Sequence, residues 1–370
     1  MSKLLKRPLK FDWPLFGIVT TLVTIGIIMI FSTSSVAGFA VFDDSFYYIK
    51  RHLIYLAIGI VAFVIGASIP YTWYRKYALS GLIVSTGLII LTFLPGIGFK
   101  AGGAYRWLDF GIIQLQPVEV LKFFVVVFLA TSLENKQSIL SDFMKGVVPI
   151  VAVLMIPIIF LAKQPDLGNI ILTLGVTFTL LLLSRVKLYQ MLAIIGSGIA
   201  LVVGNILLHP YQMDRIKSFL DPWSDPLGKS YHIIQSFIAV GSGGIFGLGI
   251  GQSKLKYFYL PLHYSDFIFS IICEEGGFIL ATTVILLFAA LFHRGLTIGR
   301  KAKELYGFYL AIGLTLYMVY QAFFNIGVVV GIFPTKGIPL TFISYGGTSL
   351  IMSLFFVGVV MNVSRLSSKE

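Results

Sequence analysis

Long apolar stretches with few charges, separated by short polar or basic connections, run along almost the whole chain. A helix that crosses a bilayer needs about 20 predominantly apolar residues. Ten stretches approach or exceed this length, at about residues 14–36, 52–70, 78–95, 117–132, 146–162, 168–184, 188–208, 265–292, 305–333 and 346–364. The pattern predicts an all-α polytopic membrane protein with about ten transmembrane helices in a single domain, residues 1–370.

A long extracytoplasmic loop, residues 209–264, is predicted between helices 7 and 8. Residues 233–250 within it are apolar enough to form another span, but a further crossing would carry the basic cluster of residues 294–303 to the outer side. We expect this segment to re-enter the membrane or to lie on its surface. Gly243, Gly247 and Gly251 recur every four residues, a spacing that lets a segment pack closely against a helix.

Composition and charge agree with this topology. The chain is 57% hydrophobic and 12% charged, whereas soluble domains are about 25% charged. Basic residues gather at the N-terminus and in the even-numbered connections, which predicts cytoplasmic termini and an outer location for residues 209–264. The net charge of +12 is attributed to contact with anionic lipid headgroups, and nucleic-acid binding is not expected.

Metal-ligating patterns are missing from the sequence. The single cysteine, Cys273, leaves neither a disulfide nor a cysteine-based metal site within the chain. The five histidines do not have the spacing of a zinc motif. No metal site made by the protein is therefore predicted.

Three carboxylates lie at or after the start of the eighth predicted helix: Asp266, Glu274 and Glu275. An acid at membrane depth is energetically expensive and is a functional candidate by default. Asp266 follows Ser265, and both residues could instead cap the helix N-terminus. A general base at neutral pH needs a balance between the helix dipole, which keeps a carboxylate ionised, and desolvation, which raises its pKa. Asp266 is a candidate for that role.

A second polar group flanks the fourth predicted helix. Arg106 and Trp107 lie in the outer connection before it, and Glu119 and Lys122 share one of its faces. In one interpretation Glu119 and Lys122 form a self-neutralised ion pair inside the bundle. In the other, Arg106 and Lys122 face an anionic substrate, because a guanidinium fork suits phosphate. Trp107 alone would be an interfacial aromatic residue.

Two outer turns that contain proline and glycine carry further polar side chains. Residues 163–169 form a tight turn that presents Gln164 and Asp166, either as a plain turn or as a contact for a cation or a sugar hydroxyl. Residues 331–350 offer Lys336, Ser344 and Tyr345 to a polar ligand, although a purely structural loop also fits.

Several of these segments together resemble the SEDS family, the shape, elongation, division and sporulation proteins of the RodA and FtsW types. The resemblance covers nearly the whole chain, in the order of the family's motifs. It is carried by GAYRWL, QPVEVLK, QPDLG, RIKSFLDPW, YLPLHYSDFIFSIICEEGGF and PTKGIPLTFISYGGTSL. The PTKG segment resembles the FtsW type more than the RodA type.

The resemblance implies a peptidoglycan glycosyltransferase of the bacterial cytoplasmic membrane, active in cell division or cell-shape maintenance. Such an enzyme polymerises lipid II into glycan strands at the outer face, beside a class B penicillin-binding protein that acts as transpeptidase. The family's essential acid matches Asp266. Its outer-cavity residues match Arg106, Glu119, Lys122, Gln164, Asp166 and the segment Ser344, Tyr345, Gly346 and Gly347. The chain departs from the family where Leu262, Tyr264, Ser265 and Thr341 replace Glu, His, Thr and Pro.

The implied reaction converts an α-linked diphosphate sugar into a β-1,4 glycoside, so it inverts the anomeric carbon. One base that deprotonates the acceptor hydroxyl is sufficient for an inversion. Arg106 and Lys122, aided by a divalent cation such as Mg²⁺ or Mn²⁺, would stabilise the leaving diphosphate. Two other functions stay open: a lipid II flippase or other transporter, and a scaffold without catalytic activity that recruits a transpeptidase.

Overall fold

Each of the ten apolar stretches is helical in the computed structural model, which describes residues 11–101, 104–109, 114–208, 210–228, 230–256, 265–335 and 337–367. The matching helices are α1 (Trp13–Phe42), α2 (Tyr47–Ser68), α3 (Ala78–Leu91), α4 (Pro117–Asn135), α5 (Val148–Lys163), α6 (Leu167–Leu182), α7 (Leu188–Leu208), α10 (Ile268–Arg300), α11 (Leu305–Val329) and α12 (Gly347–Ser367). By length and composition, seven helical segments of the described chain can cross a membrane: α1, α2, α5 with the preceding π-helical turn η2 (Phe143–Val147), α7, α10, α11 and α12. The fold is that of an all-α multi-pass membrane protein, as predicted.

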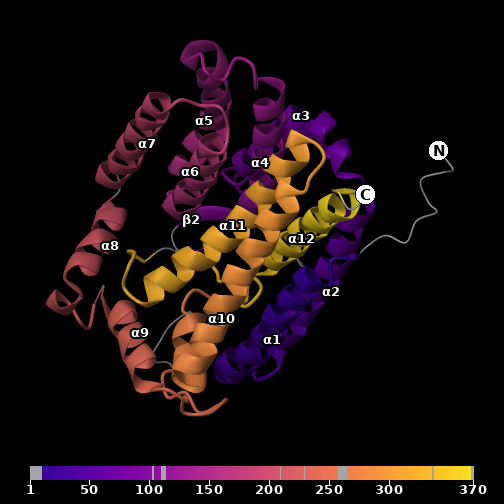
Figure 1. The fold of residues 1–370 in the computed structure, drawn as a ribbon. Helices are drawn as coiled ribbons and strands as arrows, with labels where there is room; N and C mark the ends of the chain where they lie inside the picture. The colour runs from indigo at the N-terminus through magenta and orange to yellow at the C-terminus, as the bar shows by residue number, and fades with distance from the viewer. Residues whose placement is uncertain are drawn as a thin grey trace.

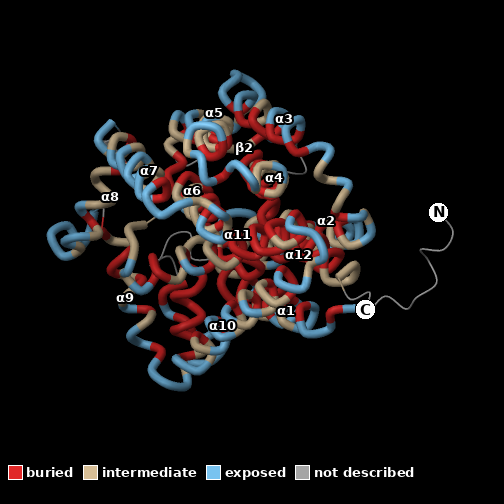
Figure 2. The backbone as a smooth tube through the Cα atoms, turned by 45° about the horizontal axis from the view of Figure 1, so that its top comes forward, coloured by how far each residue is buried: buried red, intermediate tan, exposed pale blue. Residues whose placement is uncertain are grey.

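The helices surround a centre formed by α11 and α12. Figure 1 shows α1 and α2 on one side of these helices and α7 at the opposite margin. Buried residues concentrate on α11 and α12, whereas much of α7 is exposed (Figure 2). α12 packs along α2, where Gly358 permits a close approach because a Cβ at that position would lie 2.3 Å from the carbonyl oxygen of Phe63.

A small antiparallel sheet, which the sequence analysis treated as a loop, joins α3 to α4. It contains β1 (Gly98–Ala101), β2 (Ala104–Asp109) and β3 (Gln114–Leu115) in that order. Phe99 pairs with Trp107, and Leu108 pairs with Leu115. The register shifts between Phe99 and Lys100, which leaves Arg106 on β2 without a pairing partner between the paired residues Tyr105 and Trp107.

The predicted connection of residues 209–264 lies between α7 and α10, and where it is described it contains short helical segments. It contains α8 (Pro210–Leu220), the 3-10 turn η3 (Pro222–Ser224) and α9 (Tyr231–Ser242). α9 has 12 residues and is too short to cross a bilayer, so residues 233–250 do not form a spanning helix. Residues 257–264, which include Leu262 and Tyr264, lie outside the described residues.

The connections predicted to share one side of the membrane do meet at one end of the bundle. Asp12, which caps α1, forms two hydrogen bonds of 2.9 Å with Arg294 near the end of α10. Close by, Arg75 pairs with Glu134 at the end of α4 and with Glu304 before α11. The candidate site residues gather at the other end.

Candidate active site

Asp266 lies immediately before α10 and does not cap it. Phe267 occupies the N-cap position, and no side chain makes a capping hydrogen bond there. The backbone around Asp266 is held from two sides. Its own carbonyl oxygen accepts a hydrogen bond of 2.8 Å from Nδ2 of Asn325 on α11. The carbonyl of the preceding Ser265 accepts one of 2.5 Å from Oγ of Ser344. Helix α11 and the loop before α12 therefore hold the backbone that carries the Asp266 side chain.

Two arginines set the electrostatics of Asp266. Burial raises the pKa of its carboxyl group to about 6, and the positive charges of Arg215 and Arg106, with a hydrogen bond from Ser265, oppose this rise. The carboxylate is ionised at neutral pH yet basic enough to accept a proton. These are the properties that a general base requires.

A pocket lies beside this carboxyl group and is built from four segments that are distant in sequence. They are strand β2, the turn between α5 and α6, helix α8, and the loop before α12. Its lining residues are Arg106, Pro165, Asp166, Leu167, Gly168, Gln212, Arg215 and Gly337. Gly337 connects the pocket to Asp266, because a Cβ at that position would lie 3.3 Å from Oδ2 of the carboxylate.

Hydrogen bonds fasten Arg106 to the turn between α5 and α6. Its Nε donates to the carbonyl oxygen of Gln164 at 3.2 Å, and its Nη2 donates to that of Pro165 at 2.7 Å. The Gln164 side chain is buried and donates to Oγ1 of Thr92 at 2.6 Å, so it supports the turn and does not face the pocket. Asp166 caps α6 and accepts a 2.9 Å hydrogen bond from Nδ2 of Asn169.

Arg215, on α8, is a site residue that the sequence analysis did not select. Its Nη1 donates a 2.9 Å hydrogen bond to the carbonyl oxygen of Thr335, which ties α8 to the loop that carries Gly337. The sequence contains one signal for it, since RIKSFLDPW starts with this arginine. The pattern did not indicate that the arginine would lie next to Asp266.

Glu119 and Lys122 form a buried ion pair inside the bundle, one of the two arrangements that the sequence allowed. Lys122 Nζ lies 2.7 Å from Glu119 Oε1 and 2.8 Å from Oε1 of Gln321, and the lysine side chain is 2% exposed. Gln321 in turn donates to Pro339 O and Ser349 Oγ, each at 3.1 Å. Contact of Glu119 and Lys122 with substrate is therefore not supported. Mutual neutralisation lets both charges lie inside the bundle, and Gln321 links the pair to Pro339 in the loop before α12.

The remaining candidates have supporting positions. Ser344 bonds the backbone as described above. Tyr345 stacks edge-on against Tyr48, with ring centroids 5.3 Å apart. Gly346 accepts the first hydrogen bond of α12, from Leu350 N at 2.9 Å. Trp107 is partly buried on β2, one residue beyond Arg106. Lys336 lies outside the described residues.

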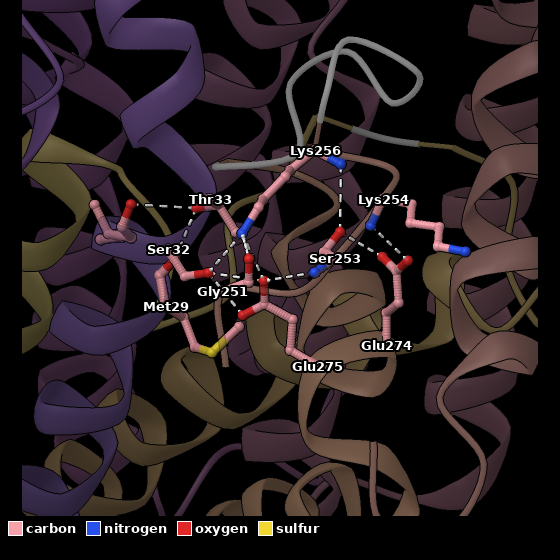
Figure 3. A network of polar contacts seen from close by, with 10 residues as sticks. Met29, Ser32, Thr33, Gly251, Ser253, Lys254, Lys256, Glu274 and Glu275 are labelled. Atoms are coloured by element: carbon pink, nitrogen blue, oxygen red, sulfur yellow. Dashed lines mark hydrogen bonds and ion pairs between the residues drawn. The ribbon is translucent and has the colours of Figure 1, made fainter. Parts of the chain in front are cut away.

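Glu274 and Glu275 do not reach this pocket. Both are 1% exposed and bind a separate group of polar residues that includes Ser32, Ser253 and Lys256 (Figure 3). Of the three carboxylates that the sequence marks, only Asp266 adjoins the pocket.

The residues around Asp266 do not fit a resident metal ion. Within the described part of the chain, no three His, Cys, Asp or Glu side chains converge. The carboxylates of Asp166 and Asp266 instead share their surroundings with two guanidinium groups. This charge pattern favours an anionic ligand over a metal ion held by the protein.

Comparison with known sequences yields matches along the whole chain. The family model of the FtsW, RodA and SpoVE cell cycle proteins matches residues 12–369. Stage V sporulation protein E of Bacillus subtilis (strain 168) is 39% identical over 356 residues, covering 96% of this chain and 97% of that protein. A protein of Trichlorobacter lovleyi named probable peptidoglycan glycosyltransferase FtsW is 39% identical over 370 residues, covering 98% and 96%.

Solved structures share the fold. A chain from a peptidoglycan synthase complex, described as coordinating polymerization and crosslinking, matches with a TM-score of 0.80 and 25% identity, covering 98% of this chain and 100% of that one. The rod shape determining protein RodA of Thermus thermophilus matches with a TM-score of 0.70 and 23% identity, covering 98% and 99%. The arrangement of helices is therefore common to these proteins.

Proposed function

The chain belongs to the FtsW, RodA and SpoVE family, and from this premise we propose that it is a peptidoglycan glycosyltransferase that polymerises lipid II, with Asp266 as the general base. The observation that carries the assignment is the Asp266 carboxylate, which is flanked by Arg106 and Arg215 beside a pocket. The FtsW-named and SpoVE relatives are both 39% identical to the chain, whereas the RodA structure is 23% identical. The chain is therefore placed on the FtsW-like side of the family.

The chemistry needs a base on one side of the anomeric carbon and stabilised negative charge on the other. Asp266 accepts the proton of the acceptor sugar hydroxyl, the oxygen forms a bond to the anomeric carbon, and the bond from that carbon to the lipid diphosphate breaks. Attack from the face opposite the leaving group inverts the configuration. No covalent intermediate with the protein is required.

Arg106 and Arg215 are the cations that serve the departing diphosphate. A guanidinium presents several fixed donors that match phosphate oxygens, and charge that develops in the transition state is stabilised most by groups already held in place. Both arginines are anchored to backbone carbonyls. A Mg²⁺ or Mn²⁺ ion would arrive with the diphosphate as part of the substrate, and chelator sensitivity of polymerisation tests this.

The charged site lies at one end of the bundle, which favours an enzyme over a transporter with its binding site at the membrane midplane. We place this end outside the cytoplasmic membrane and both termini in the cytoplasm, since the basic connections lie at the opposite end. The complex that contains the fold's structural relative coordinates polymerization with crosslinking. A class B penicillin-binding protein is accordingly the proposed partner.

The assay is polymerisation of purified lipid II in detergent micelles, with glycan strands resolved on gels. Micelles have no sides, so a flippase alone yields no product. Asp266→Asn is expected to reduce polymerisation by about 10²–10⁴-fold, the usual contribution of a general base. The matched control is Asp44→Asn, which removes an acid that pairs with Lys50 at the connection between α1 and α2.

Each outcome has a distinct meaning. Full activity of Asp266→Asn refutes the base assignment. If the wild-type protein makes no product even with its cognate transpeptidase, the enzyme assignment is wrong and a scaffold is favoured.

A further inference from the structure

Helix α10 is interrupted near its start. Gly277 has φ 64° and ψ −166°, which ends the regular helix and leaves residues 268–276 as a separate helical piece directly after Asp266. The backbone N–H and C=O groups that lose their helical partners at this break form hydrogen bonds with the backbone of residues 244–249. The four bonds run from Leu248 N to Glu274 O (2.9 Å), Gly249 N to Glu275 O (3.0 Å), Phe278 N to Gly244 O (2.9 Å) and Ile279 N to Ile245 O (3.2 Å). A second chain segment thus replaces the missing helical hydrogen bonds.

The glycine repeat of the sequence makes this contact feasible. A Cβ on Gly243 would lie 1.8 Å from the carbonyl oxygen of Cys273, and one on Gly247 would lie 2.2 Å from that of Glu275. Gly247 also has a φ of +80°, which is unfavourable for residues with a side chain. The predicted close packing against a helix is confirmed for Gly243 and Gly247, with α10 as the partner, whereas a Cβ on Gly251 would meet no atom within 4 Å.

A buried ionic network holds the same junction to α1 (Figure 3). Both carboxylate oxygens of Glu275 accept from Ser32 Oγ on α1, at 2.7 and 2.8 Å. Lys256 Nζ lies 3.1 Å from Glu275 Oε1 and donates to Gly251 O at 2.5 Å. Glu274 accepts from Ser253 Oγ at 2.5 Å. Helix α1 and the stretch of residues 251–256 therefore both meet the C-terminal end of the 268–276 piece.

Stability does not by itself account for this network. Glu275 and Lys256 are 1% and 4% exposed, and replacing a buried ion pair by well-packed apolar side chains of similar size often leaves stability unchanged or raises it. Hydrogen bonds and ion pairs depend on orientation, because each carboxylate oxygen must face its donor. The network thereby defines how the 268–276 piece is oriented relative to α1.

We propose that Ser32, Lys256 and Glu275 form a pivot that sets the position of Asp266. This inference rests on the proposed role of Asp266 as base. At 1.5 Å per residue, Glu275 lies about 13 Å along the chain from Asp266, so a rotation of about 5° at the pivot moves the carboxylate by about 1 Å. A displacement of 1 Å in a catalytic group lowers the rate by up to about 100-fold. Glu275 and Lys256 are thus positioning residues.

The test compares Lys256→Met, Glu275→Met and the double variant, with Ser32→Ala as the mildest change. The chain contains one cysteine, Cys273, which is buried in the 268–276 piece. Its rate of labelling by a maleimide reports movement of that piece without any activity measurement. Asp12→Asn is the matched control, because it breaks an ion pair between α1 and α10 beyond the Gly277 break.

We expect each single variant to lose about 10- to 100-fold in kcat, with KM nearly unchanged and Cys273 labelled faster. Ser32→Ala should show the same changes to a smaller degree. The double variant should recover Tm but not kcat, whereas Asp12→Asn should lower only Tm. If the double variant regains both Tm and kcat, or if Cys273 labelling is unchanged in every variant, the pivot is refuted. If the wild type is inactive but labelling changes as expected, the pivot stands and the proposed catalytic function fails.

Discussion

Replacing Asp266 by asparagine should have opposite effects on activity and on stability. The substitution keeps the shape of the side chain and removes its ability to ionise. Burial raises the pKa of the Asp266 carboxyl from 3.8 to about 6, even though Arg215, Arg106 and Ser265 act in the other direction. A pKa that rises on folding means that the native structure disfavours the charged form more than the unfolded chain does.

The sign and size of the stability effect follow from this pKa. The stability associated with the protonated group is fully present below pH 3.8, declines as the pH rises, and is lost above about pH 6. A change from 3.8 to about 6 corresponds to about 3 kcal/mol, and partial solvent exposure of the side chain lowers this to about 1–3 kcal/mol. Since asparagine never ionises, Asp266→Asn should exceed the wild type by that amount near neutral pH and should match it near pH 4.

Thermal unfolding of the purified protein in detergent, followed from about pH 4 to about pH 8, measures the difference. Asp44→Asn serves as the control, because the pKa of Asp44 shifts in the opposite direction: hydrogen bonds from Lys50 and from the amide of Phe46 lower it. That variant should gain no stability at neutral pH. If Asp266→Asn is less stable than the wild type at every pH, the carboxylate is a structural anchor and the reasoning about its desolvation is wrong.

Three further predictions concern the residues around the site. The rate of polymerisation should fall below about pH 6 as the Asp266 carboxyl takes up a proton. Arg215→Gln should move this fall to higher pH, because Arg215 lowers the pKa of Asp266. If the pH–rate profile does not move, Arg215 does not act on Asp266. Lys122→Met leaves Glu119 buried without its ion pair and should cost about 3–5 kcal/mol of stability, most of which Glu119→Gln in the same chain should restore in thermal unfolding. Gly247→Ala should lower Tm because its Cβ would meet a backbone carbonyl at 2.2 Å, whereas Gly241→Ala, with open space around it, should not.

Much of the architecture was predictable from local pattern. Each of the ten apolar stretches coincides with a helix, and seven helical segments of the described chain are long and apolar enough to cross a bilayer. The four-residue glycine spacing predicted a tight contact with a helix, and Gly243 and Gly247 make one with α10. These features depend on residues that are close together in the sequence, so the sequence alone is enough to predict them.

Local pattern did not predict the small sheet or the helices inside residues 209–264, whose short segments carry a weaker periodic signal than a spanning helix. It also left open which charged residues serve the site. By local pattern Asp266, Glu274 and Glu275 are alike as acids near one helix start; the resemblance to the SEDS family singled out Asp266, and in the structure only Asp266 adjoins the pocket.

The sequence by itself determined the membrane class of the protein, its helices and the short list of acids. The tertiary structure decided the role of each charge. Lys122 is neutralised by Glu119 and held by Gln321, which is 199 positions away, whereas Arg215 is brought to Asp266 by the docking of α8. The physical reason is that the energy of a charge depends on its desolvation and on its partners in space, and those partners come from distant parts of the chain.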